Sequence, residues 1–120
     1  MTAELTTERT IGPQAKQSAI VWIDSTKAIV ARTLPGGGSR ATTIPHPVRD
    51  AAEDSHDLAA VADGIGNCDQ ILILGPVSMR TALEREYVAI FHRPDRIVDV
   101  DTAVDPTEAE LLERLHRLVQ

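Results

Sequence analysis

Residues 18–44, SAIVWIDSTKAIVARTLPGGGSRATTI, contain two unbroken apolar runs followed by a short Thr-rich segment. The first run is rich in β-branched residues, which suits a central strand covered on both faces. Residues 24–27 supply a turn before the second run, and residues 35–39 can reverse the chain again because glycine tolerates positive φ. Residues 40–44 are stopped by Pro45 and Pro47, as expected of an edge strand. The stretch therefore predicts a three-stranded antiparallel meander.

After this meander the hydrophobic period changes from two to three or four, which indicates helices alternating with strands. Leu58, Val61, Ala62 and Ile65 form a helical stripe, and a second helix is predicted at residues 77–91. Apolar strands are predicted at residues 70–74 and 96–102. The last helix follows Asp105-Pro106-Thr107-Glu108, a capping-box pattern with Asp105 as the N-cap.

The element order is therefore β-β-β-α-β-α-β-α, which predicts an α/β fold. Hairpin-linked strands are antiparallel, whereas strand-helix-strand units are parallel with right-handed crossovers. The expected result is a mixed five-stranded sheet with order 3-2-1-4-5 and helices on its faces, the ribonuclease H-like arrangement.

The chain has 120 residues, which predicts a single domain. Residues 1–17 lack hydrophobic periodicity and contain Gly12-Pro13, so we expect a flexible N-terminal tail ahead of one α/β domain at residues 18–120. Cys68 is the one cysteine, which excludes an internal disulfide and fits a reducing cytosol. No secretory signal or membrane span is visible in the sequence, so we expect a cytoplasmic protein without a membrane partner.

The formal net charge of −6 opposes indiscriminate binding to nucleic acid, and we expect no DNA partner. Acidic residues concentrate at residues 49–69 and beyond residue 97, so the basic residues elsewhere can form one positive side. Gly75 and Arg80 open a helix directly after a strand, where free backbone N–H groups can receive a phosphate, although an ordinary strand-to-helix connection fits the same residues. The candidates for binding an anion or RNA are Arg32, Arg40, Gly75, Arg80, Arg85 and Arg93.

Asp24 and Asp101 lie at the carboxyl ends of two strands, at the same edge of the predicted sheet, where a metal-dependent nuclease would hold its metal ions. Two-metal hydrolysis needs further carboxylates, and the intervening strand ends instead in Gly75-Pro76. The four histidines show no metal-ligand spacing and no second cysteine accompanies Cys68. We therefore expect no cofactor and no catalytic residues, and we keep the nuclease as an alternative.

Three stretches carry a resemblance to a known family: residues 21–24 with the hairpin after them, residues 71–83, and residues 98–102. They resemble the middle domain of archaeal and eukaryotic class I peptide-release factors, of Pelota-type rescue factors and of bacterial release-factor-like proteins. In release factors, the loop before the first helix carries the Gly-Gly-Gln tripeptide that promotes peptidyl-tRNA hydrolysis. Here residues 45–53 form that loop without Gly-Gly-Gln, and Gly36-Gly37-Gly38 lies one hairpin too early.

The resemblance implies a noncatalytic release-factor-like binding domain that associates with the ribosome, with tRNA or with a translation-linked partner. Two alternatives stay open. One is a stress-associated or housekeeping interaction module that forms a homodimer through an exposed strand or helix face. The other is the metal-dependent nuclease built on Asp24 and Asp101.

Overall fold

The computed structural model describes residues 6–9, 12, 16–24, 26–45, 54–101 and 106–119. Six strands and three α-helices make up these residues, and a 3-10 turn at Pro94–Arg96 precedes the last strand. The elements in chain order are β1 Thr6–Arg9, β2 Ser18–Ile23, β3 Lys27–Thr33, β4 Ser39–Pro45, α1 Asp54–Ile65, β5 Gln70–Leu74, α2 Val77–Phe91, β6 Ile97–Asp101 and α3 Glu108–Val119.

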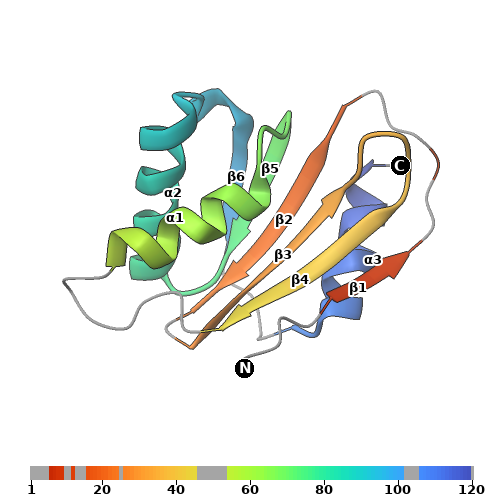
Figure 1. The fold of residues 1–120 in the computed structure, drawn as a ribbon, viewed down its shortest axis with the longest axis horizontal. Coiled ribbons are helices and arrows are strands. Elements are labelled where there is room, and N and C mark those ends of the chain that lie inside the picture. Colours follow the sequence, from red (N-terminus) through yellow and green to blue (C-terminus); the bar gives the residue numbers. More distant parts are fainter. Residues whose placement is uncertain are drawn as a thin grey trace.

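The six strands form one mixed sheet with the order β1-β4-β3-β2-β5-β6. β2, β3 and β4 form the antiparallel meander, and β5 and β6 continue the sheet in parallel from β2. The α/β class and the relative order of the five predicted strands are therefore confirmed (Figure 1).

The predicted count of five strands is wrong, because β1 pairs antiparallel with β4 and adds a sixth strand to that edge. These residues belong to the predicted flexible tail. Thr6–Arg9 has no apolar alternation, and strand prediction depends on that pattern. β1 is held at the edge of the sheet by backbone pairing, and β4, predicted as an edge strand, lies one position inside it.

Two apolar cores lie on opposite faces of the sheet, because successive side chains of a strand point to opposite faces. Val21 and Ile23 of β2 pack with α1 and α2 on one face. Ile20 and Trp22 pack with α3 on the other face. All six residues of β2 are buried, as the unbroken apolar run predicts for a central strand. Figure 1 shows α1 and α2 on one side of the sheet and α3 behind it.

α3 begins two residues later than the sequence analysis expected. The N–H of Glu110 donates to the Thr107 hydroxyl at 3.1 Å, and the Thr107 N–H donates to the Glu110 carboxylate at 2.8 Å. This reciprocal pair is a capping box in which Thr107, not Asp105, is the N-cap. Of the described helices, none is both long and apolar enough to span a membrane.

Candidate anion-binding groove

Cross-strand pairs between β3 and β4 place three sets of side chains beside α1. Their register joins Ala28 with Ile44, Val30 with Thr42, and Arg32 with Arg40. Because side chains alternate between faces, every second pair lies on the same face of the sheet. Ala28 and Val30 belong to the core under α1 and α2, so the two arginines lie side by side on this face.

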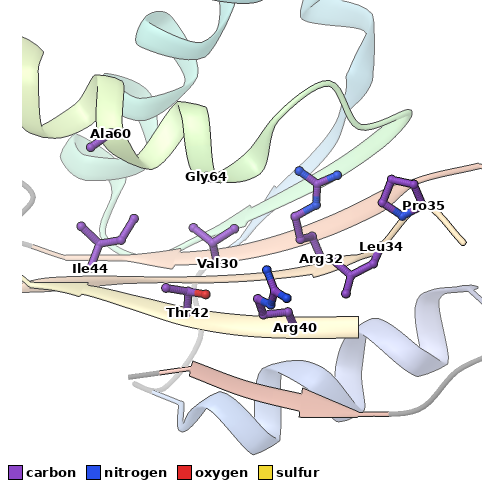
Figure 2. A pocket seen from close by; sticks show the side chains of 9 residues that line it. All are labelled: Val30, Arg32, Leu34, Pro35, Arg40, Thr42, Ile44, Ala60 and Gly64. Atoms are coloured by element: carbon purple, nitrogen blue, oxygen red, sulfur yellow. The ribbon is translucent and has the colours of Figure 1, made fainter. Parts of the chain in front are cut away.

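A groove of about 490 Å³ lies between α1 and these strands. Among the described residues, α1 contributes the small Ala60 and Gly64 to it. The carbons nearest to Gly64, those of Ile44 and Val30, come no closer than 3.7 Å to the place a Cβ would occupy. Figure 2 shows Arg32 and Arg40 at one end of the groove and Ile44 and Ala60 at the other. The described lining residues include no acid; they are Val30, Arg32, Leu34, Pro35, Arg40, Thr42, Ile44, Ala60 and Gly64.

Arg32 is fixed in place by backbone carbonyl groups. Its Nη1 donates to the Ile65 carbonyl at 2.9 Å, and its Nε donates to the Thr33 carbonyl at 3.2 Å. Ile65 is the last residue of α1, where the helix dipole and unpaired carbonyls favour a cation. The half-buried guanidinium is therefore held in one orientation before any ligand arrives.

Gly66 makes the position of Arg32 possible. Its backbone has φ +70°, and its N–H donates to the Ala62 carbonyl, so it ends α1 in a left-handed conformation. A Cβ at this position would collide with Nη1 of Arg32. The sequence shows a glycine at this position, but sequence alone does not show which side chain occupies the space above it.

Arg40 differs from Arg32 in being exposed. Two like charges directly opposite each other on neighbouring strands destabilise a sheet unless other charges compensate them. Arg40 does have polar interactions of its own, and its partner in β1 by backbone register is Glu8. The arrangement therefore presents one fixed and one exposed guanidinium at the mouth of an apolar groove.

The structure does not bring the other predicted anion-binding residues to this groove. Arg80 and Arg85 lie on α2, and Arg93 follows it in an exposed ion pair with Asp95 at 3.3 Å. Gly75 is buried with φ +131°, and a Cβ there would collide with the Ile23 carbonyl oxygen. That close approach to β2 gives Gly75 a structural reason to be glycine.

Asp24 has a structural role in the turn between β2 and β3. Its Oδ1 accepts hydrogen bonds from the Thr26 N–H and hydroxyl, both at 2.8 Å, and from the Lys27 N–H at 2.9 Å. Burial acts to raise the pKa of Asp24, but these hydrogen bonds outweigh burial and lower that pKa below its ordinary value. The carboxylate is thus engaged in stabilising a turn.

Asp101 ends β6 and pairs with Leu74, which in turn pairs with Trp22, so Asp24 and Asp101 lie near the same edge of the sheet. The Asp101 side chain lies outside what the structure describes. Within the described residues, no group of three or more His, Cys, Asp or Glu side chains is arranged to hold a metal ion.

No family model matches this chain, and no curated protein matches it. Among solved structures, the chain is similar to Pelota from Archaeoglobus fulgidus, with a TM-score of 0.51 and 14% sequence identity. The chain shares a fold with part of Pelota. The match covers 87% of this chain and 32% of the Pelota chain, so the chain spans about a third of that protein's length. The resemblance to Pelota-type factors is thus supported at the level of the fold.

Proposed function

We propose that this chain is a noncatalytic, Pelota-like domain that associates with the ribosome by binding RNA in the groove between α1 and β4. The family resemblance of the sequence and the fold shared with part of Pelota support a translation-associated role. They also support the ribonuclease H-like interpretation of the sheet. The anionic partner in this proposal is the phosphate backbone of ribosomal or transfer RNA.

The observation that carries the proposal is the cross-strand pair of Arg32 and Arg40 at one end of the groove. A guanidinium presents planar donors that match phosphate oxygens, and the fixed orientation of Arg32 reduces the entropy lost on binding. Val30, Leu34 and Pro35 supply apolar walls beside the cations, against which a ribose or base can pack. Because the whole chain is acidic, attraction to RNA is confined to this local patch.

Co-sedimentation of the full chain with purified ribosomes over a series of KCl concentrations tests the proposal. We expect binding at low salt that falls as salt rises, because phosphate contacts release counterions. Arg40→Gln should weaken binding and lower the slope of log affinity against log salt by about 1. Lys16→Gln removes the same charge from an exposed residue that does not line the groove, and it should leave the slope unchanged.

Two results would count against the proposal: no ribosome association at low salt, or binding by the Arg40→Gln chain equal to that of the unmodified chain. Circular dichroism of both variants checks that the fold is retained.

In parallel, RNA incubated with the chain and Mg²⁺ should stay intact, because Asp24 is held in a turn. Cleavage that disappears in Asp24→Asn would favour the nuclease instead.

A further inference from the structure

One side of α3 has its charges separated along the helix. Glu110 and Glu113 lie in its first half, and Arg114 and Arg117 lie in its second half. These four positions have the i, i+3, i+4, i+7 spacing of a single helical stripe. Glu110, Glu113 and Arg117 are exposed and Arg114 is half-buried, so the stripe faces away from the core under α3.

A second groove, of about 330 Å³, runs along the basic half of this stripe. Its floor is the buried pair Ile20 and Leu72 from β2 and β5, and Arg114, Arg117 and Leu118 of α3 form its wall. α3 packs against β1, β2, β3 and β4. The groove therefore lies beside the helix on the β5 side, on the face of the sheet opposite the α1 groove.

Neither arginine of the stripe forms an ion pair or hydrogen bond with any residue that the structure describes. Glu110 precedes Arg114 by four residues, and Glu113 precedes Arg117 by four, a spacing at which such pairs form readily on helices. Glu110 instead accepts the capping hydrogen bond from Thr107. Among the residues whose side chains the structure describes, no acid contacts the two guanidinium groups that border the apolar groove.

We propose that a second copy of this chain docks on this stripe, with its α3 antiparallel to the first about a two-fold axis between Glu113 and Arg114. In that register Glu113 faces Arg114 of the second copy, and Glu110 faces Arg117 of the second copy. The same register places the exposed Ala109 opposite Leu118 of the second copy.

The order of the charges along α3 indicates that the molecule that docks on the stripe is a second copy of this chain. A two-fold interface must be complementary to itself, and an acidic half followed by a basic half satisfies this requirement in the antiparallel arrangement alone. In a parallel arrangement, like charges would face each other. The dimer leaves the α1 groove open on the opposite face, so it does not depend on the RNA-binding proposal.

Charge-reversal variants of the full chain, examined by sedimentation velocity over a range of protein concentrations, test the dimer. Glu113→Arg and Arg114→Glu should each weaken self-association by at least about tenfold, because each places like charges across the axis. An equimolar mixture of the two variants should recover the dimer, because each reversed side chain then faces an opposite charge. Association of the unmodified chain should also weaken as KCl is raised.

Three results would each overturn the proposal: a chain that stays monomeric at about 1 mM, a dimer that neither reversal weakens, or a mixture that does not recover association. Thermal unfolding shows whether each variant is folded. If Arg114→Glu does not fold, Arg117→Glu replaces it, because Arg117 is exposed. Since Arg117 faces Glu110 of the second copy, Glu110→Arg then takes the place of Glu113→Arg in the mixture. Ribosome co-sedimentation of Glu113→Arg should match that of the unmodified chain, which separates failure of the dimer from failure of the α1 groove.

Discussion

Gly75 connects β5 to α2 at a point where two strands leave no room for a side chain. Its φ of +131° is strained for any other residue, and a Cβ would meet the Ile23 carbonyl oxygen. We expect Gly75→Ala to lower the free energy of unfolding by more than about 3 kcal/mol in urea titrations.

Gly36→Ala is the matched control for this substitution. Gly36 also has positive φ, at +92°, but nothing lies within 4 Å of its missing Cβ. Gly36→Ala should lower the free energy of unfolding by about 1 kcal/mol, because it adds backbone strain alone. Equal losses in the two variants would show that the contact with Ile23 is not the cause.

The lowered pKa of Asp24 predicts how the stability of the fold depends on pH. Its pKa is lowered in the folded chain, so the carboxylate stabilises the fold at pH values above its unfolded pKa. That contribution is lost as the pH falls through the lower, folded pKa. Asp24→Ala should therefore be less stable than the unmodified chain at pH 7, and the difference should shrink below about pH 4. Urea titrations at a series of pH values measure it; a difference that is constant with pH would contradict this role.

At the scale of elements, the capping box of α3 is a local feature with a measurable effect. Thr107→Ala removes the hydroxyl that accepts the Glu110 N–H, and it should cost about 1 kcal/mol of unfolding free energy. Thr81→Ala is the matched control, because Thr81 is exposed within α2 and alanine favours helices there. A loss no larger in Thr107→Ala than in Thr81→Ala would show that the cap contributes nothing.

Elements with a clear hydrophobic period were predictable, and the element without one was not. β5, which is apolar after Gln70, and the stripe of α1 were both predicted, since burial on both faces gives a strand a continuous apolar run and burial on one face gives a helix a period of 3.6. Thr6–Arg9 has no such pattern, and it forms β1 by pairing its backbone with β4.

The predicted N-cap of α3 is wrong for a related reason. Thr107 and Glu110 have capping-box spacing as well, and the two hydrogen bonds between them identify Thr107 as the N-cap.

At the scale of the whole molecule, the two cores should unfold together because β2 and β5 contribute side chains to both faces of the sheet. Cys68 reports on this cooperativity: it is completely buried, and its Sγ donates to the Ile65 carbonyl at 3.2 Å. Burial also raises the pKa of the Cys68 thiol, which keeps it in the unreactive protonated form.

We therefore expect modification of Cys68 by a thiol reagent to require global unfolding. The free energy of opening obtained from the modification rate should equal the free energy of unfolding measured in urea. Gly75→Ala should lower both free energies by the same amount. A smaller free energy of opening would indicate local opening of the loop after α1.

The sequence by itself determined the α/β class, the order of the five predicted strands and the identity of the arginines. Such properties follow from the residue pattern along the chain, because burial selects side chains by local period. Only the tertiary structure decided that Arg32 lies opposite Arg40 at a groove that Arg80 and Arg85 do not line, that β1 joins the sheet, and that Gly66 makes room for a guanidinium. These depend on register and on contacts between residues distant in sequence, which local patterns do not encode.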